Sequence, residues 1–213
     1  MNRGFEMKKI LSAAMAFIML FCLCACSGEQ GEKFVPARGT VESGVYTNGV
    51  FGITFAGDEN WYYYSDEEIA ASMGLSAGDI PGADDSKALA EAGIIYDMYC
   101  ANTATGGTVN ITYEDLSATY GEVIDVEYYL ELYQMEINTQ LNSGNISIKK
   151  NEIGFAGIGE AMYPCLNIAA DFGGLGIYET IIVKKCGDWL GVITIAALNE
   201  AELSDLAEKI TFE

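Results

Sequence analysis

The sequence contains no histidine, and this absence removes much of the side-chain chemistry that hydrolases and zinc proteins use. Ser–His and Cys–His nucleophile pairs, histidine-ligated zinc and the most common general base are all excluded. Carboxylates remain as groups that could perform acid–base catalysis, as paired Asp and Glu side chains do in glycosidases. The chain has 31 Asp and Glu residues, so two neighbouring carboxylates are expected even without a catalytic role.

Asp97 is the best single candidate for a catalytic carboxylate, because it interrupts the apolar stretch Ile94–Tyr99. Strand alternation places Asp97 on the same face as Ile95 and Tyr99. A position at a sheet edge or facing solvent explains this residue more simply than catalysis does. We therefore predict that the chain has no catalytic residue and is not an enzyme.

Metal binding is the next possibility, since acidic residues gather in two predicted loops. These residues are Asp58 and Glu59 in one loop, and Asp79, Asp84 and Asp85 in the other. Neither group has the alternating spacing of a calcium-binding loop, and a solvated loop is the simpler interpretation. We predict no metal and no cofactor.

Three cysteines follow Cys26 in the chain, at Cys100, Cys165 and Cys186. One disulfide among them and three buried free thiols are both consistent with the sequence. Their spacing does not form a Cys-x-x-Cys pair, and the lack of a histidine partner argues against thiol catalysis. Two glycine-rich stretches, 154–159 and 173–176, lack the lysine of a phosphate-binding loop and are interpreted as turns.

Aromatic side chains are the remaining candidates for a binding site. The sequence Trp61-Tyr62-Tyr63-Tyr64 places aromatic groups on both faces of one short strand. Exposed Tyr and Trp side chains favour the recognition of proteins or sugars. We take Trp61, Tyr62 and Tyr64 as candidate partner-binding residues, with packing in the core as the simpler alternative.

Residues 1–25 have the three-part pattern of an export signal. Lys8 and Lys9 are followed by the uncharged segment Ile10–Leu23, and small residues then precede a cysteine. The uncharged segment is shorter than the roughly 20 residues that a membrane-spanning helix needs. Met7, which is followed directly by two lysines, is an alternative start to Met1.

The end of this signal, Leu23-Cys24-Ala25-Cys26, resembles the lipobox of bacterial lipoproteins. The resemblance implies that Cys26 receives a diacylglyceryl group and becomes the first residue of a membrane-anchored chain. Cys24 departs from the usual small residue, and an ordinary secretory signal is the alternative. An anchor with two acyl chains would attach the protein durably to the extracytoplasmic side of a membrane.

The composition is that of a folded and strongly acidic domain. Half of the 213 residues are apolar, the net charge is −20, and removal of residues 1–25 makes it −22. Such acidity argues against nucleic-acid binding, which needs clustered Lys and Arg. We predict a linker over residues 26–43 and a single domain over residues 44–213.

The domain contains signals for both strands and helices. Asn48-Gly49 predicts a tight hairpin turn, and Ser65 with Glu68 predicts a helix that begins with a capping box and ends at Gly74. Further helices are predicted over 87–92, 126–142 and 199–209. Strands are predicted over 45–47, 51–55, 61–64, 94–101, 108–114, 146–151, 161–170, 177–185 and 189–197.

Two of these elements have a face that the pattern defines. The helix over 126–142 has an apolar stripe that includes Tyr133 and an opposite polar side that includes Glu131. In the strand over 108–114, the alternation predicts that Asn110, Thr112 and Glu114 face outward.

These elements describe an α+β fold, in which helices flank both faces of an antiparallel sheet. The order of elements resembles the PsbP/Mog1-type α/β/α sandwich. The resemblance rests on Gly52-Ile53-Thr54-Phe55 followed by Trp61, a long middle helix, a meander, a closing helix and a terminal Thr211-Phe212. It implies an accessory, binding type of role and carries over no catalytic residue.

The function that the sequence favours is a non-enzymatic surface lipoprotein that binds a protein or carbohydrate partner. Two alternatives stay open at this point. One is a carboxylate-dependent hydrolase of envelope glycans, and the other is a lipoprotein that binds a small ligand or calcium.

Overall fold

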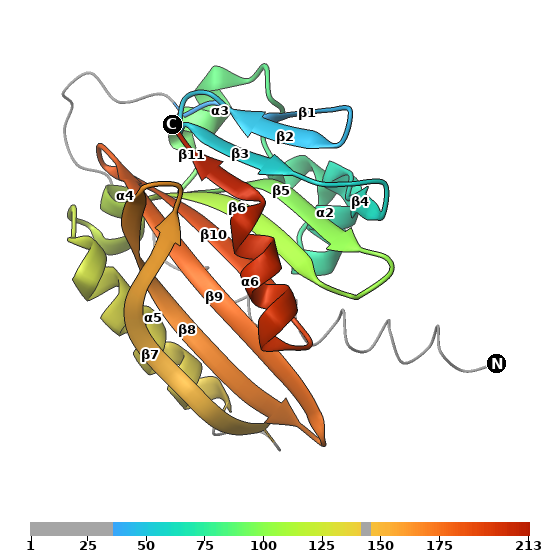
Figure 1. The fold of residues 1–213 in the computed structure, drawn as a ribbon. Coiled ribbons are helices and arrows are strands. Elements are labelled where there is room, and N and C mark those ends of the chain that lie inside the picture. The colour runs from blue at the N-terminus through green and yellow to red at the C-terminus, as the bar shows by residue number, and fades with distance from the viewer. Residues whose placement is uncertain (1–35, 142–145) are drawn as a thin grey trace.

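The computed structural model describes residues 36–141 and 146–213, which form two antiparallel sheets and five α-helices (Figure 1). The larger sheet has seven strands in the order β4-β5-β6-β10-β9-β8-β7. The smaller sheet has four strands in the order β1-β2-β3-β11. Within the described ranges, no helix has the length and apolar character needed to cross a membrane.

The bounds of the elements follow. The strands are β1 Thr40–Glu42, β2 Val45–Asn48, β3 Ile53–Ala56, β4 Trp61–Tyr63, β5 Ile94–Asn102, β6 Thr108–Asp115, β7 Ile146–Ile158, β8 Ala161–Phe172, β9 Leu175–Cys186, β10 Trp189–Ala197 and β11 Ile210–Phe212. The helices are α2 Asp66–Met73, the 3₁₀ helix η1 Ala77–Asp79, α3 Ser86–Glu91, α4 Leu116–Tyr120, α5 Val126–Leu141 and α6 Glu200–Glu208.

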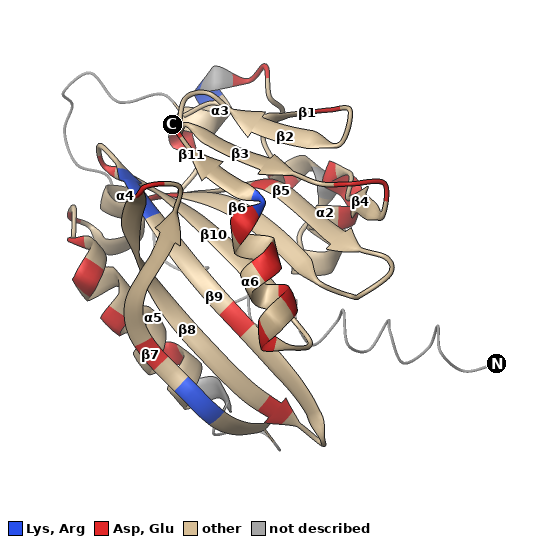
Figure 2. Ribbon diagram, in the orientation of Figure 1, with Lys and Arg blue, Asp and Glu red and all other residues tan. Residues whose placement is uncertain are grey.

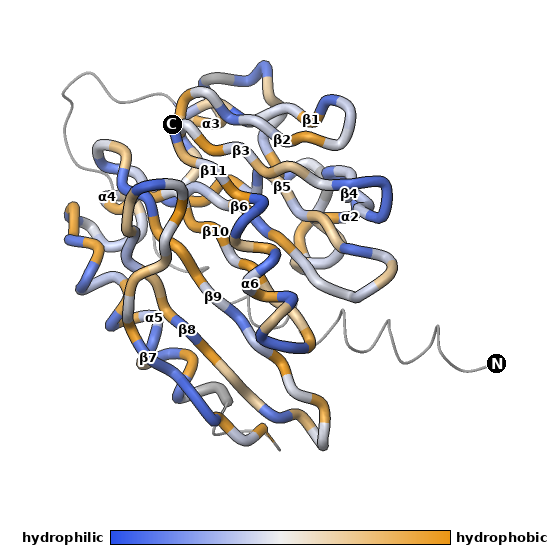
Figure 3. Tube along the Cα trace, viewed as in Figure 1, coloured by the Kyte–Doolittle hydropathy of each residue, from blue (hydrophilic) through white to orange (hydrophobic). Residues whose placement is uncertain are grey.

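Helices lie on both faces of the larger sheet, which confirms the predicted α+β fold class. On one face, Tyr129, Leu130, Tyr133 and Ile137 of α5 pack against β8, β9 and β10. On the other face, Leu206 of α6 and the smaller sheet share one core with the strands. Figure 3 shows the hydrophobic residues that run along β9 and β10, as expected for strands covered on both faces.

The predicted capping box of α2 is present. The Ser65 hydroxyl accepts from the backbone N–H of Glu68, and the Glu68 carboxylate accepts from the backbone N–H of Ser65. α2 ends at Gly74, whose φ of 70° is the left-handed conformation that favours glycine. Asn199 caps α6 by accepting from the backbone N–H of Glu202.

The predicted linker includes residues 40–42, and the structure corrects this boundary. Residues 40–42 form β1, which pairs with β2, so the folded domain begins before residue 44. The predicted export signal over residues 1–25 and the processing site at Cys26 lie outside the described residues.

The first predicted hairpin forms, but its turn is longer than two residues. Asn48 pairs with Ile53, so residues 49–52 make up the connection, and the Asn48 side chain accepts from the backbone N–H groups of Val50 and Phe51. β2 and β3 of this hairpin belong to the smaller sheet, which β11 completes by pairing with β3.

β7 is longer than predicted. The sequence predicts a turn in the glycine-rich stretch after Glu152, yet Gly154 and Gly157 are strand residues opposite Cys165 and Met162 of β8. The reversal of the chain comes at residues 159–160 instead. The second glycine-rich stretch does contain the predicted turn, at Gly173 and Gly174.

The predicted outward face of β6 does not face water. Asn110 and Glu114 are buried, and Thr112 is half-buried. The alternation of the strand was correct, since Val109, Ile111 and Tyr113 lie in the core on the opposite side. The polar side is buried because the helices cover it: Tyr129 of α5, for example, donates a hydrogen bond to Glu114.

Candidate functional site

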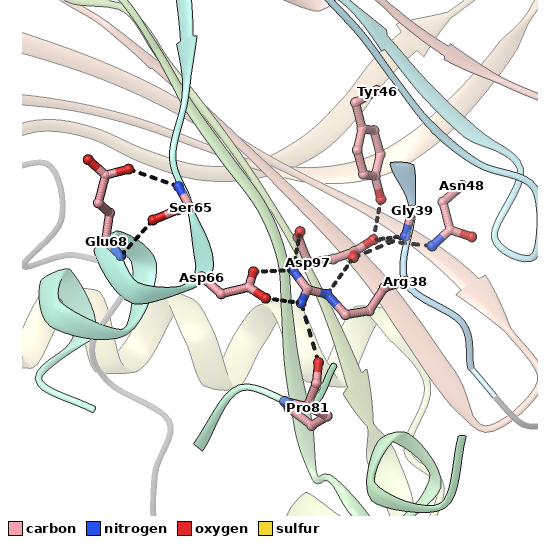
Figure 4. A network of polar contacts seen from close by, with 9 residues as sticks. All are labelled: Arg38, Gly39, Tyr46, Asn48, Ser65, Asp66, Glu68, Pro81 and Asp97. Atoms are coloured by element: carbon pink, nitrogen blue, oxygen red, sulfur yellow. Dashed lines mark hydrogen bonds and ion pairs between the residues drawn. The ribbon is translucent and has the colours of Figure 1, made fainter. Parts of the chain in front are cut away.

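A network of charged and polar side chains surrounds Asp97 on β5 (Figure 4). The Asp97 side chain is fully buried and accepts hydrogen bonds from the Arg38 guanidinium, the Gly39 backbone N–H, the Tyr46 hydroxyl and the Asn48 amide. The predicted solvent-facing position of Asp97 is therefore wrong. With four different donors, its charge is compensated in the way that a buried carboxylate requires.

A β-bulge explains why the alternation misplaced Asp97. The register between β5 and β6 shifts between Tyr96 and Met98, so Asp97 is an extra residue without a partner in the ladder. The faces after the bulge are exchanged, and Tyr99 points away from the core that contains Ile95 and Met98. Asp97 and Tyr99 therefore do not share a face as predicted.

Arg38 is the cation at the centre of this cluster. Two of its nitrogens donate to Asp66 Oδ1 and Oδ2, each at 2.7 Å, and its Nε donates to Asp97 Oδ1 at 3.2 Å. Burial alone would lower the pKa of Arg38, but the hydrogen bonds and charges of Asp66 and Asp97 raise it. The same hydrogen bonds lower the pKa of Asp66.

The Asp66 and Asp97 carboxylates are the closest approach to a glycosidase pair in this cluster. A retaining glycosidase separates its two carboxyl groups by about 5 Å and places the glycosidic bond between them. Here the Arg38 guanidinium occupies the space between the two carboxylates and binds both. The geometry is that of an ion-pair network which fastens the segment before β1 to α2 and β5.

Two further buried carboxylates lie on the α5 side of the larger sheet. Glu114 accepts a hydrogen bond from the Tyr129 hydroxyl at 2.9 Å, and burial raises its pKa to about 7. Glu179 on β9 is 2% exposed, and burial raises its pKa to about 8. One carboxyl oxygen of each residue is buried without a hydrogen-bond partner.

The strand register excludes cooperation between these two groups in glycoside hydrolysis. Glu114 lies opposite Leu190 of β10, and Glu179 lies opposite Ala196 of the same strand. Six residues of an extended strand span about 20 Å, whereas the carboxyl groups of glycosidases lie about 5 to 10 Å apart. The carboxylate-dependent hydrolase therefore finds no support in the pairs that the structure brings together.

Two serine motifs of hydrolases occur in the sequence but not in the structural context that they need. Ser76 lies in a Gly-x-Ser-x-Gly sequence, but this segment joins α2 to η1, whereas a nucleophile elbow joins a strand to a helix. Ser147 and Lys150 have Ser-x-x-Lys spacing on the extended strand β7, where three residues span about 10 Å. Neither serine has a base placed to activate it by these motifs.

The predicted partner-binding aromatic residues separate into two groups. Trp61 is buried and packs edge-on against Phe55, which is the alternative of packing in the core, and it is not exposed to a partner. Tyr62 is 48% exposed, and Tyr64 is half-buried beside it with ring centroids 5.1 Å apart. Tyr64 in turn packs edge-on against the buried Tyr99. Tyr62 and Tyr64 thus remain candidates, with Tyr62 at the outer end of an aromatic row.

The other candidate groups form no site in the described residues. Within residues 36–141 and 146–213, no group of three or more acidic or cysteine side chains is arranged to hold a metal ion. The two predicted acidic loops stay separate. Cys100 and Cys165 are buried free thiols, and Cys186 is a partly buried one.

Sequence reasoning missed Arg38, although the sequence contains a signal for it. The chain has two arginines, Arg3 and Arg38, and Arg3 lies in the predicted export signal. A single arginine in an acidic domain is a natural partner for a carboxylate on an apolar strand. The partners Tyr46 and Tyr113, whose hydroxyls lie 2.7 Å apart, carry no such signal because tyrosine is frequent in this chain.

Comparison with known proteins gives structural likeness without a family. No family model matches the chain, and no curated protein matches it. The solution structure of cyanobacterial PsbP (CyanoP) from Synechocystis is 10% identical, and the match covers 88% of this chain and 98% of that one with a TM-score of 0.47. A PsbP protein is thus among the similar structures, as the sequence resemblance implied.

Two other solved structures are similar at a lower level. LpqN, described as involved in cell envelope biogenesis of Mycobacterium tuberculosis, is 11% identical over 75% of this chain and 82% of its own, with a TM-score of 0.38. A protein from Bacteroides thetaiotaomicron is 8% identical over 81% of this chain and 49% of its own, also with a TM-score of 0.38. At TM-scores below 0.5, these likenesses carry no inference about the role of the chain.

Proposed function

We propose that the chain is an extracytoplasmic lipoprotein, anchored through Cys26, whose domain binds a protein partner and performs no catalysis. The lipobox-like sequence before Cys26 supports the anchor. The absence of catalysis is supported by the roles of these acids: Asp97 and Asp66 hold Arg38, and the buried Asp115 caps α4. The other two buried acids, Glu114 and Glu179, lie too far apart to cooperate.

The observation that carries this proposal is the exposed ring of Tyr62. Its hydroxyl donates to both oxygens of Glu68, at 2.8 and 3.0 Å, and its ring packs edge-on against Tyr64. Contacts on two sides limit the conformations of the side chain before any partner arrives. A restrained, half-exposed tyrosine offers a large contact area at a low cost in conformational entropy, which is why tyrosine is frequent at binding interfaces.

The charge around Tyr62 favours a partner with a basic surface. The first turn of α2 carries Asp66, Glu67 and Glu68, and acidic residues are spread over α5 and α6 as well (Figure 2). An acidic surface accelerates association with a basic one and repels acidic competitors. A basic protein segment that covers the Tyr62 ring fits both features.

Affinity capture with a matched pair of tyrosine variants tests this function. The immobilised full-length chain is incubated with the envelope proteins of the producing organism, and the captured proteins are quantified for wild type, Tyr62→Ala and Tyr128→Ala. Tyr128 on α5 is a suitable control because it is 49% exposed, almost the same as Tyr62.

The proposal predicts that a specific protein is captured by wild type and by Tyr128→Ala, and at least tenfold less by Tyr62→Ala. Equal capture by both variants would show that Tyr62 is not in the interface. Retention of envelope glycan in place of protein, or release of cleaved glycan, would contradict the proposed function itself.

A further inference from the structure

One strand differs from the others that lie at a sheet edge. Among the residues that the structure describes, three of the four edge strands, β1, β4 and β11, are three residues long, whereas β7 has thirteen residues. Short edge strands are one of the devices by which proteins avoid pairing with other chains. At β7 this device is absent.

The first half of β7 carries other protective features. Lys149 and Lys150 place positive charge on it, and a bulge between Ile148 and Lys150 interrupts the regular register. The Gln134 side chain of α5 donates to the Asn151 backbone carbonyl at 2.8 Å, so this carbonyl is already occupied. Charge, a bulge and a cover over the backbone all discourage strand addition.

The second half, from Ile153 to Ile158, lacks these features. It contains no charged residue, and within the described chain no strand pairs with its outer side. Phe155 lies opposite Pro164 of β8, which has no N–H to donate. This fits a non-hydrogen-bonded position, in which the N–H and C=O of Phe155 point away from β8. Asn151, whose outward carbonyl accepts from the Gln134 side chain, lies an even number of residues from Phe155. Ile153, Phe155 and Gly157 follow the same alternation, so their backbone N–H and C=O groups point to the open edge.

Exposed apolar side chains accompany this edge. Phe155 is 64% exposed and Ile153 is 38% exposed, and alternation places both on the same face. Met162 of β8, opposite Gly157, is 63% exposed on that face as well. The residues of the opposite parity, Ala156 and Ile158, pack into the core that contains the smaller sheet. A strand that paired with this edge would therefore form backbone hydrogen bonds with β7 and also contact these apolar side chains.

We propose that this edge pairs with the same edge of a second copy of the chain, antiparallel and centred on Phe155. In this register each Phe155 lies opposite Phe155 of the other copy, and Ile153 lies opposite Gly157. All three outward-facing residues are then used, and the occupied Asn151 lies beyond the paired segment. Antiparallel pairing also brings Lys150, before the paired segment, toward the end of the second copy that carries Glu160, and both residues are exposed.

Backbone geometry and charge both favour the register centred on Phe155 over registers centred two residues earlier or later. A centre on Ile153 would place the occupied Asn151 opposite Phe155, and a centre on Gly157 would place Phe155 opposite Gly159, in the turn. The overall charge of −20 opposes the approach of two copies, but at physiological salt this repulsion is screened over about 8 Å. The centre on Phe155 brings the opposite charges of Lys150 and Glu160 together at both ends of the paired segment, and these charges partly offset the repulsion.

Site-specific disulfide formation in the full-length chain tests this proposal. In the proposed register, Phe155→Cys places two sulfur-bearing residues directly opposite, with Cα atoms about 5.5 Å apart, which is within the range of a disulfide. Ile153→Cys places the two cysteines four residues apart along the strand, about 13 Å, which is too far. Val123→Cys, on the loop before α5, controls for random collisions because Val123 is 45% exposed.

The natural cysteines do not interfere with the measurement, because cleavage after Glu152 and Glu160 releases residues 153–160 without a natural cysteine. Each purified variant is mildly oxidised, cleaved after glutamate and analysed by mass spectrometry for the disulfide-linked pair of this fragment. We expect the pair from Phe155→Cys at least tenfold above that from Ile153→Cys, and no dimer that depends on Val123→Cys.

A linked fragment from Ile153→Cys but not from Phe155→Cys would overturn the register, and none from either would overturn the pairing. Sedimentation equilibrium of the full-length chain in detergent gives a second, cysteine-independent result. Wild type should sediment as a dimer, Phe155→Lys as a monomer, and Val123→Lys as wild type. A monomeric wild-type chain would refute the pairing but leave the Tyr62 interface untouched, since the two surfaces share no residue.

Discussion

At the scale of single residues, the fold depends on how the buried charge of Asp97 is compensated. Asp97 is the residue that the sequence singled out, and its chemistry proves to be structural. The Arg38 guanidinium and three other donor groups satisfy its oxygens, so the carboxylate remains compensated although its side chain is fully buried. Removal of the Asp97 charge leaves Arg38 with Asp66 as its remaining paired carboxylate and weakens the hydrogen bonds that the buried oxygens accept from Gly39 and Tyr46.

Asp97→Asn should therefore lower the free energy of unfolding by about 2–3 kcal/mol, measured by urea denaturation, since hydrogen bonds to a charged group contribute about that much. The change keeps the size of the side chain but removes the charge that Arg38 and Gly39 bind. Asp58→Asn is the matched control, because Asp58 forms a surface ion pair with Lys209 at 3.6 Å. If both variants unfold at the same urea concentration as wild type, the network does not stabilise the fold.

Glu179 makes stability depend on pH. Burial raises its pKa from 4.5 to about 8, so the folded state favours the neutral carboxyl. The resulting stabilisation is fully present below pH 4.5 and is lost as the pH rises toward and through 8. Between pH 5 and pH 8 the loss amounts to about 3 kcal/mol, since one pKa unit corresponds to about 1.4 kcal/mol. Glu114, with its pKa raised to about 7, contributes with the same sign.

Glu179→Gln should flatten this dependence because its amide is neutral at every pH. Urea denaturation at pH 5 and pH 8 should show a smaller difference in unfolding free energy for the variant than for wild type, by about 3 kcal/mol. Glu131→Gln, on the exposed side of α5, should retain the wild-type difference. Identical pH profiles for Glu179→Gln and wild type would mean that Glu179 is not held neutral.

The sequence could identify Asp97 as unusual but not place it. Alternation across β5 assumes a regular strand, and the bulge at Asp97 breaks that assumption. Its partner Arg38 lies 59 residues earlier, and its other partners Tyr46 and Asn48 lie about 50 residues earlier, so no local pattern connects them. Polar networks built from distant segments are not encoded in the periodicity of any one element.

At the scale of elements, local sequence signals were sufficient to predict those helix ends and faces that depend on residues within the same helix. The capping box of α2 and the apolar stripe of α5 both depend on residues three or four apart, and both are present as predicted. β7 was predicted too short because glycine is usual in turns, yet its extended backbone also suits Gly154 and Gly157 when a partner strand pairs with them.

The buried stripe of α5 gives a test at this scale. Tyr133 is 7% exposed in the core against the larger sheet, and Glu131 is exposed on the other side of the helix. Tyr133→Asp should reduce the unfolding free energy by about 3 kcal/mol or more, because it creates a buried charge and a cavity. Glu131→Lys should change it by less than about 0.5 kcal/mol. Equal effects in thermal or urea unfolding would show that the assigned helical face is wrong.

At the scale of the whole molecule, the sequence could predict the α+β class but not the presence of two sheets. The smaller sheet is closed by β11, which pairs with β3 although Ile210 and Phe55 are far apart in the chain. β1 and β11, with three residues each, carry too little periodicity to be recognised, and the pairing of β11 is decided by the core that the smaller sheet shares with α6. The seven-stranded sheet was more predictable, because β8, β9 and β10 are joined by short turns.

The fastening of Arg38 limits how far the domain can lie from the proposed anchor. Eleven residues, 27–37, separate Cys26 from Arg38, and a fully extended chain of this length spans at most about 40 Å. The predicted linker over 26–43 would have allowed a longer separation. The proposed lipoprotein is therefore held close to the membrane, while its charge of −22 after processing repels anionic lipid headgroups.

Intact-mass analysis of protein extracted from membranes tests the processing. The mature chain should begin at Cys26 and carry the mass of a diacylglyceryl group, and Cys26→Ser should abolish both the adduct and membrane attachment. Cys24→Ser is the matched control, since the proposed processing leaves it in the removed segment. A water-soluble product that begins at another residue would contradict the lipid anchor.

Quantitative binding of the captured partner to the full-length chain tests the proposed binding function most directly. The dissociation constant is measured by titration of the purified partner onto immobilised wild type, Tyr62→Ala and Tyr128→Ala, in parallel with an assay for glycan cleavage by the same preparations. The proposed function predicts saturable binding of the partner by wild type. Tyr62→Ala should raise the dissociation constant at least tenfold, and Tyr128→Ala should change it by less than twofold. None of the three preparations should cleave glycan. Glycan cleavage by wild type that Asp97→Asn abolishes in a folded chain would contradict the proposed function, as would binding that does not change in Tyr62→Ala.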